Sequence, residues 1–229
     1  RGLRVVLENL QDYGNRAAIL RSVEAFGLLH VDEISDPRCA DPNGKTSKGR
    51  SIVNGAEKWL HVRQHSVVTD CVSSLHKDGF SVLAAVPPGC NAGGHAPILL
   101  EAIDFGTSTA LVFGSEGYGV SAELLRQCDG AFTVPLAGLS ESLNVSVAVA
   151  VCCHFGRHQR ALALGLPQGR GDLTHEEFQD LAAEYARRSL EHNFVGAMRS
   201  RRSRRTKALQ NRANGSLACE GEEFHDRDT

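Results

Sequence analysis

The chain has 229 residues, a hydrophobic fraction of 41%, a charged fraction of 23% and a formal net charge of -2 at pH 7. This composition is ordinary for a globular protein and excludes a chain that is disordered throughout. No run approaches the roughly 18 consecutive apolar residues that cross a bilayer, so an integral membrane protein is excluded. We expect a soluble protein with no membrane partner. The sequence leaves its compartment open between the cytoplasm and an organelle, either chloroplast or mitochondrion.

Strand-like and helix-like patterns alternate along the first half of the chain. Short aliphatic runs predict strands, and apolar residues three or four apart predict helices. These patterns predict strands at 3–7, 29–34, 59–62 and 81–86 and helices at 15–26 and 66–77. The polar segment 35–58 and the Gly/Pro-rich segment 87–97 are typical of loops.

The second half continues the alternation. Strands are expected at 109–113 and 131–134, and a long apolar helix at 144–164 begins with Ser and Asn, which cap helices. A last helix is expected from Thr174 to about Gln210, because Thr174 and Glu177 form a capping box. Strands that alternate with helices predict an α/β fold with a mostly parallel sheet flanked by helices.

Charge divides the C-terminal part of the chain. Nine Lys or Arg residues and one acidic residue lie between Arg187 and Arg212, whereas five acidic residues lie among the last ten. We therefore expect a globular domain over 1–165, a basic helical extension over 166–212 and a disordered acidic tail over 213–229. A dense basic block is typical of a phosphate-binding arm, and the alternative is a solvated helix end.

The seven cysteines form no CxxC pair, and Cys152 and Cys153 are adjacent within an apolar run. Neither a disulfide framework nor a zinc ribbon fits this spacing. We expect buried, reduced thiols and no metal site.

A glycine-rich loop, Gly114-Ser-Glu116-Gly117-Tyr-Gly119, follows the strand predicted at 109–113. Its spacing is neither that of a dinucleotide-binding fingerprint nor that of a P-loop, which argues against a nucleotide-dependent oxidoreductase.

Further polar residues follow other strands: Asn15, Arg21, Ser142 and Asn144. In a parallel sheet these groups gather at the carboxyl edge, where ligands bind. For Ser142 and Asn144, helix capping is an equally good interpretation. For Arg21, the alternative is a solvated position on its helix.

Three segments in order resemble the motifs of one known family. The first is Asn15-x5-Arg21-x4-Phe26-Gly27, the second runs from Leu111 to Ser121, and the third runs from Val134 to Ala148. They are similar to the motifs of the SpoU/TrmH family of RNA 2'-O-ribose methyltransferases, in the SPOUT superfamily. The resemblance covers roughly residues 3–160 and includes Gly55-Ala56-x-x-Trp59.

The resemblance implies a fold whose C-terminal portion forms a deep trefoil knot that holds S-adenosylmethionine. It implies cofactor contacts, largely through backbone groups, and a homodimer whose sites are completed across the interface by the first motif. The residues implied to bind the cofactor are Gly114, Val134, Leu143, Leu111, Gly117 and Gly119.

The implied reaction is methylation of a ribose 2'-hydroxyl. Arg21 matches the family's catalytic arginine, and its permanent charge favours binding a phosphate or stabilising a developing alkoxide over acting as a base. Asn15 and Asn144 would position Arg21 and the ribose, Glu116 would orient Arg21 or the loop, and Ser142 would be a hydrogen-bonding partner.

The segment after 174 is similar to the branch that methylates guanosine 18 in the tRNA D-loop. The residues expected to contact RNA phosphates are Lys45, Lys48, Arg50, Arg199, Arg201, Arg202, Arg204 and Arg205. The motifs leave open a ribosomal RNA 2'-O-methyltransferase and a non-catalytic RNA-binding protein of the same fold.

Overall fold

The computed structural model describes residues 2–35, 56–90, 94–167 and 171–190. The chain divides into two compact units, Arg1–Leu173 and Thr174–Thr229, and the second is described over 174–190 only. The basic residues at 45–50 and 199–205 and the acidic tail therefore lie outside the described residues.

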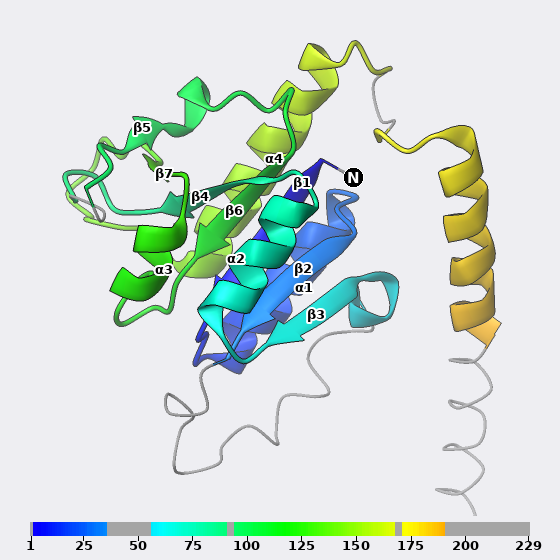
Figure 1. Ribbon diagram of the computed structural model, residues 1–229, viewed down its shortest axis with the longest axis horizontal. Coiled ribbons are helices and arrows are strands. Elements are labelled where there is room, and N and C mark those ends of the chain that lie inside the picture. The colour runs from blue at the N-terminus through cyan, green and yellow to red at the C-terminus, as the bar shows by residue number, and fades with distance from the viewer. Residues whose placement is uncertain (1, 36–55, 91–93, 168–170, 191–229) are drawn as a thin grey trace, which may run out of the picture. The chain divides into compact units, whose positions relative to one another are not determined.

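Seven described strands form a fully parallel sheet in the order β3-β2-β1-β6-β4-β7-β5 (Figure 1). The strands are β1 Leu3–Glu8, β2 His30–Ile34, β3 His61–His65, β4 Ser81–Ala85, β5 Ile98–Leu99, β6 Thr109–Phe113 and β7 Gly130–Thr133. The predicted parallel α/β fold is confirmed. The strand expected at 59–62 begins two residues later, because Trp59 closes a 3-10 turn, η4 Ala56–Trp59.

The helices of the first unit are α1 Tyr13–Ala25, α2 Val68–Lys77, α3 Ala122–Gln127 and α4 Val145–Ala163, with a 3-10 turn, η5, at Leu100–Ala102. β5 and α3 were not expected from the sequence, because two strand residues and six helical residues are too few to show a period. In the second unit residues 175–190 are helical, and the expected box is present: Thr174 N donates to Glu177 Oε2 at 2.8 Å. No described helix is long and apolar enough to cross a membrane.

Alternate residues of each strand face opposite helical layers. On β1, Leu3, Val5 and Leu7 pack in a core with α1 and α4, whereas Val6 packs in a second core with α2 and α3. This follows from the period of two in a strand, and a sheet covered on both faces explains the continuous apolar runs. Figure 1 shows the sheet between these layers.

Four of the five described cysteines, Cys71, Cys128, Cys152 and Cys153, are buried, and all five are free. Burial raises the pKa of the Cys71, Cys128 and Cys152 thiols to about 12, so they stay protonated and unreactive at neutral pH. The expectation of buried thiols is confirmed for these four, whereas Cys90 is exposed.

Candidate functional site

Three side chains from distant parts of the sequence form a hydrogen-bonded chain at the carboxyl edge of the sheet. Asn15 Nδ2 donates to Glu116 Oε1 at 2.7 Å, and Asn144 Nδ2 donates to Asn15 Oδ1 at 3.1 Å. Asn15 lies in the first turn of α1, which follows β1; Glu116 lies in the loop after β6, and Asn144 precedes α4. The sheet therefore brings one residue of each sequence motif to a single place, as the parallel arrangement predicted.

Helix capping holds two of these residues. Asp12 Oδ1 accepts from Asn15 N at 2.9 Å and so begins α1 beside the site. Asn144 Oδ1 accepts from Ser146 N at 2.9 Å and begins α4, while its amide nitrogen reaches Asn15. A carboxamide has both an acceptor and donors, so Asn144 can cap a helix and join the polar chain at once.

Arg21 lies apart from this chain of hydrogen bonds. Six helical residues rotate by about 600°, so Arg21 lies roughly 120° around α1 from Asn15. Its side chain is exposed and forms no hydrogen bond or ion pair with other residues in the described part of the chain. The partner found for Glu116 is Asn15, so the expected contact between Glu116 and Arg21 within one chain is not present among these residues. Ser142 is likewise exposed and apart from the chain of hydrogen bonds.

The glycine-rich loop folds back tightly on itself. Ser115 and Gly119 form an antiparallel bridge, with Gly119 N donating to Ser115 O at 2.9 Å. A Cβ on Gly114 would lie 1.9 Å from the carbonyl carbon of Gly119, so no other residue fits there. A Cβ on Gly117 would meet nothing within 4 Å, and residues 116–119 are exposed. The loop thus presents open backbone at the edge of the sheet.

A buried carboxylate that the sequence analysis missed holds the far end of this loop. Glu8 is 2% exposed, and its two oxygens accept from Ser121 N at 2.7 Å and Ser121 Oγ at 2.6 Å. Ser121 is also the N-cap of α3, where its Oγ accepts from Leu124 N. Glu8 ends β1, so it ties the loop after β6 to the neighbouring strand. No motif spacing signals such a pair; only the adjacency of the two strands does.

The apolar residues expected to line a cofactor site divide into two kinds. Val134 and Leu143 are half-buried in the segment between β7 and α4, where a ligand can reach them. Leu111 is 0% exposed in the middle of β6 and belongs to the core with α1 and α4. The Leu111 side chain therefore supports the strand that leads to the loop, and the cofactor contact expected at this position, largely through backbone groups, stays a prediction.

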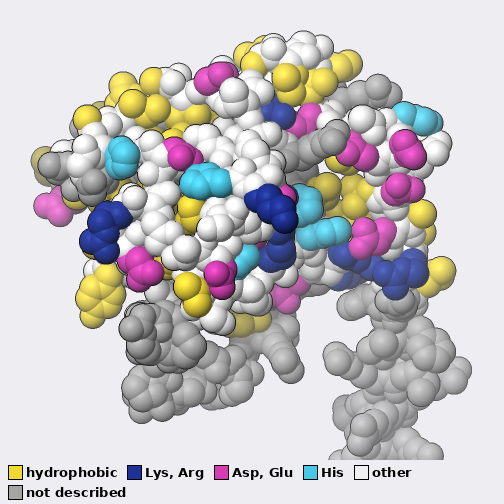
Figure 2. All heavy atoms as spheres, viewed as in Figure 1, with side chains coloured by type: hydrophobic (Ala, Val, Ile, Leu, Met, Phe, Trp, Pro, Cys, Tyr) yellow, Lys and Arg dark blue, Asp and Glu magenta, His cyan; other side chains and the backbone are white. Residues whose placement is uncertain are grey.

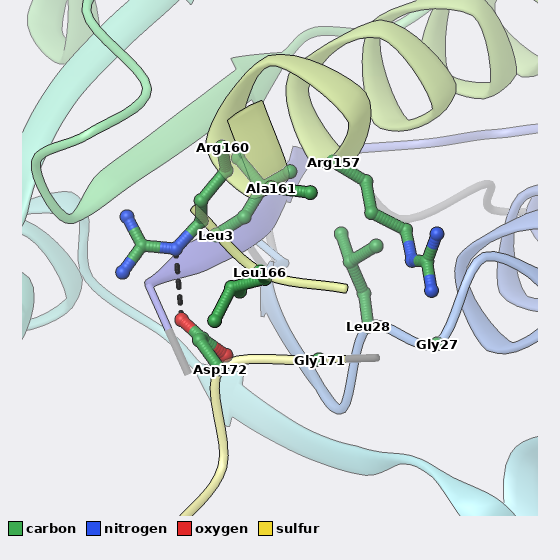
Figure 3. Close-up of a pocket in the computed structure, with 9 residues that line it drawn as sticks. All are labelled: Leu3, Gly27, Leu28, Arg157, Arg160, Ala161, Leu166, Gly171 and Asp172. Carbon is green, nitrogen blue, oxygen red and sulfur yellow. Dashed lines mark hydrogen bonds and ion pairs between the residues drawn. The ribbon is translucent and has the colours of Figure 1, made fainter. Parts of the chain in front are cut away.

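A pocket at the opposite edge of the sheet belongs to a structural junction (Figure 3). Arg160 of α4 donates from Nε to Asp172 Oδ2 at 2.8 Å and from Nη1 to the Phe105 and Thr107 carbonyls, each at 2.9 Å. The guanidinium lies against Gly2, where a Cβ would meet it at 1.9 Å. Its Nε and Nη1 join α4 to Asp172 and to the segment before β6, so we interpret this pocket as part of a structural junction and not as the candidate site.

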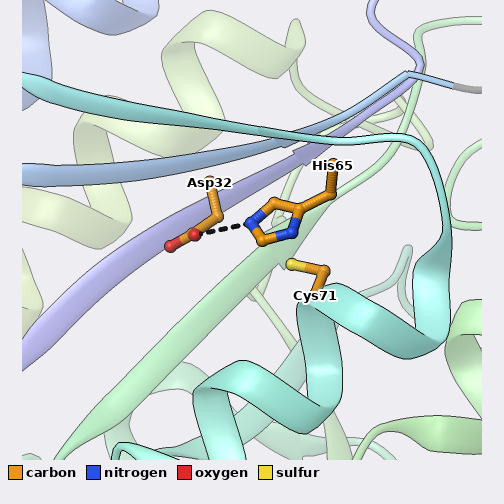
Figure 4. A group of neighbouring side chains, drawn as sticks. All are labelled: Asp32, His65 and Cys71. Atoms are coloured by element: carbon orange, nitrogen blue, oxygen red, sulfur yellow. Dashed lines mark hydrogen bonds and ion pairs between the residues drawn. The ribbon is translucent and has the colours of Figure 1, made fainter.

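Asp32, His65 and Cys71 lie together on the α2 face of the sheet (Figure 4), with donor atoms within 4.8 Å of one another. His65 Nε2 is 2.9 Å from Asp32 Oδ1, Arg63 Nε is 3.5 Å from the same oxygen, and Arg4 Nη1 is 3.9 Å from Oδ2. Two guanidinium groups already balance the 1% exposed carboxylate and would repel a metal ion. This group is best described as a buried ion-pair network.

The chain is similar to known proteins in sequence and in fold. Residues 2–154 match the model of the SpoU rRNA Methylase family. The chain is 33% identical over 186 residues to a tRNA (guanosine(18)-2'-O)-methyltransferase of Thermus thermophilus, covering 81% of this chain and 89% of that one. The TrmH/SpoU tRNA modifying enzyme of A. aeolicus superposes with a TM-score of 0.62 at 26% identity, covering 80% and 87%. AviRb from Streptomyces viridochromogenes, solved with AdoMet, superposes with a TM-score of 0.54 at 22% identity, covering 69% and 60%; this shows likeness of fold.

Proposed function

The chain belongs to the SpoU rRNA methylase family, and on that premise we propose that it transfers a methyl group from S-adenosylmethionine to a ribose 2'-hydroxyl of RNA. The observation that carries the proposal is the hydrogen-bonded chain of Asn15, Glu116 and Asn144. Each residue comes from a different motif, and all three meet at the edge where parallel sheets bind ligands.

The residues around the glycine-rich loop fit S-adenosylmethionine. Open backbone at Gly117 and Gly119 allows close approach to a ligand, and half-buried Val134 and Leu143 offer apolar contact. Thr133 Oγ1, next to Val134, is buried without a hydrogen-bond partner among the described residues. When bound, the cofactor would supply an activated methyl group on its sulfonium for transfer to the ribose oxygen.

The protein must align the 2'-hydroxyl with that methyl group and stabilise the oxygen as its proton leaves. Arg21 is assigned to the second task, because an exposed guanidinium can bind the adjacent phosphate and the developing negative charge together. Asn15 and Asn144 are assigned to orienting the ribose, Glu116 to fixing Asn15, and Ser142 to a hydrogen bond with the substrate.

A homodimer is part of this proposal. Arg21 faces solvent in a single chain, apart from the hydrogen-bonded chain of Asn15, Glu116 and Asn144, which supports a second copy whose cofactor site it would reach. Val147 and Val151 of α4 are 47% and 40% exposed, and α4 packs against α1, so an apolar face adjoins the helix that carries Arg21.

The proposed fold also includes the family's trefoil knot. In the sheet, β6 lies between the earlier strands β1 and β4, which supports this proposal.

The proposed substrate is guanosine 18 in the tRNA D-loop, on the strength of the Thermus thermophilus relative's name and of the shared length. Lys and Arg are interspersed with Asp and Glu among the described residues visible in Figure 2. RNA binding is assigned to Lys45, Lys48 and Arg50 and to the arginines at 199–205, because these basic residues are clustered in the sequence. Removing residues 199–229 is expected to weaken tRNA binding and to flatten its dependence on salt.

The test is transfer of labelled methyl from S-adenosylmethionine to unmodified tRNA and, separately, to ribosomal RNA, with the modified nucleotide mapped. A 2'-O-methylguanosine in the D-loop is the expected product. Label on ribosomal RNA alone would keep the reaction and overturn the substrate. No label on either RNA, with the cofactor still bound, would overturn catalysis in favour of an RNA-binding protein.

A further inference from the structure

A polar cluster on the α1 face of the sheet, separate from the carboxyl-edge site, surrounds Arg16. Its guanidinium donates to both oxygens of Glu33, from Nε to Oε1 at 2.7 Å and from Nη2 to Oε2 at 3.1 Å. Its third nitrogen, Nη1, donates to Glu57 Oε1. Arg16 is therefore engaged through all of its nitrogens and joins α1 to two other elements.

These contacts follow from sheet register and helix phase. Glu33 lies on β2 and is the Cα partner of Gln64 on β3, whose amide also donates to Glu33 Oε2. Glu57 lies in η4, directly before β3. Glu33 is 7% exposed, so its charge needs a close partner, and only a planar guanidinium can donate to both oxygens of one carboxylate and to a second carboxylate at once.

Arg16 directly follows Asn15, which is held by Glu116 and Asn144. The first turn of α1 is therefore fixed from two sides: Asn15 holds it to the loops of the candidate site, and Arg16 holds it to β2 and η4. Burial would lower the pKa of Arg16, but hydrogen bonds to Glu33 and Glu57 and their negative charges raise it above its ordinary value. The cation is thus permanent at any pH at which the protein folds.

We propose that Arg16 is a positioning residue for methyl transfer, which fixes the rotation of α1 and so places Asn15 and Arg21 for the reaction. The inference rests on the proposed function. The side-chain hydrogen bonds of Arg16 go to Glu33 and Glu57, on β2 and η4, and not to the glycine-rich loop, so its loss should disturb the chemical step and leave cofactor binding unchanged. Misplacement of reacting groups by about 1 Å lowers rates by about 100-fold.

The experiment compares Arg16→Met and Arg16→Lys with the matched control Arg63→Met. Arg63 also spans two carboxylates, Asp32 and Asp78, but on the α2 face of the sheet. For each variant the kcat, the KM for RNA, the dissociation constant for S-adenosylmethionine and the thermal midpoint are measured. Lys keeps the charge at position 16 but not the fork of donors, so Arg16→Lys is expected to keep most stability and still lose kcat.

We expect kcat to fall about 10- to 100-fold in both Arg16 variants, with the cofactor dissociation constant changed less than about twofold. Arg63→Met should lower the thermal midpoint without lowering kcat. If Arg16→Met does not fold, Glu57→Ala replaces it. The Glu57 side chain is 40% exposed, and its loss removes the contact between Arg16 and η4 while the contacts between Arg16 and Glu33 remain.

Wild-type kcat in a folded Arg16→Lys variant would overturn the inference while leaving the proposed function intact. An equal loss of kcat in Arg63→Met would also overturn it, because the effect would then follow from stability alone. Absence of methyl transfer by the wild-type protein on either RNA would instead overturn the proposed function, and the inference with it.

Discussion

Asn15 Nδ2 lies 2.7 Å from Glu116 Oε1, although 101 residues separate the two in the sequence. Asn15 comes from the helix after β1 and Glu116 from the loop after β6, and β1 and β6 are neighbours in the sheet. The contact joins the first and second sequence motifs. Mutating this pair therefore tests directly whether the residues of the candidate site act together.

A double-mutant cycle on Asn15→Ala and Glu116→Ala should therefore be non-additive. Each single variant removes the same hydrogen bond, so we expect a coupling of about 1 kcal/mol in the free energy of activation for methyl transfer. Initial rates at saturating cofactor measure it. Asn15→Ala combined with Glu123→Ala, an exposed residue of α3, is the control and should be additive. Additivity in the first pair would show that the hydrogen bond has no part in the reaction.

Arg21→Ala should lower kcat by at least about 100-fold, the usual cost of losing a group that stabilises transition-state charge. Because Arg21 is exposed and forms no hydrogen bond or ion pair within the described part of the chain, the thermal midpoint and the cofactor dissociation constant should not change. Methyl-transfer rates at saturating RNA and cofactor measure kcat, and calorimetry measures the thermal midpoint and the cofactor dissociation constant. Arg126→Ala, another exposed helical arginine, should retain full activity. Retained turnover in Arg21→Ala would remove Arg21 from the mechanism.

Gly114→Ala and Gly117→Ala should differ in stability. The added methyl group at Gly114 would lie 1.9 Å from backbone of Gly119, which cannot move without opening the loop. We expect a loss of at least about 1–3 kcal/mol, as for overpacking, together with loss of cofactor binding. At Gly117 nothing lies within 4 Å, so the fold should tolerate alanine. Urea unfolding of both variants measures the difference, and equal stabilities would contradict the loop geometry.

His30 should make the protein less stable in mild acid. Burial, together with the charges of Arg4 and His61, lowers the pKa of His30 to about 4, whereas an unfolded histidine titrates near 6.5. The unfolded chain then binds the proton first, so this contribution is fully present above about pH 6.5 and is lost as the pH falls towards 4.

The measurement is urea unfolding at pH 7 and pH 4.5 for the wild type, His30→Gln and the control His158→Gln, whose histidine is exposed. We expect the free energy of unfolding to fall less with acid in His30→Gln than in the wild type. His158→Gln should match the wild type. An unchanged pH dependence in His30→Gln would mean that His30 is not held neutral by its surroundings.

Periodicity was sufficient for most of the fold. β1, α1, α2, β4, β6 and α4 each follow from an apolar pattern within the element itself, and all lie within two residues of their expected bounds. Short elements could not be found this way: the two residues of β5 and the six of α3 show no period, and their places depend on β7 and on the cap that Ser121 provides.

The sequence by itself determined that Asn15, Glu116 and Asn144 follow strands of a parallel sheet, and hence that they share an edge. The tertiary structure decided which side chains meet. Strand order makes Glu8 the partner of Ser121, and register makes Glu33 the neighbour of Gln64. The rotation of α1 places Asn15 in the hydrogen-bonded chain and Arg21 outside it. Local patterns fix the conformation of each segment, whereas a contact between distant residues depends on how whole segments pack, and no single segment contains that information.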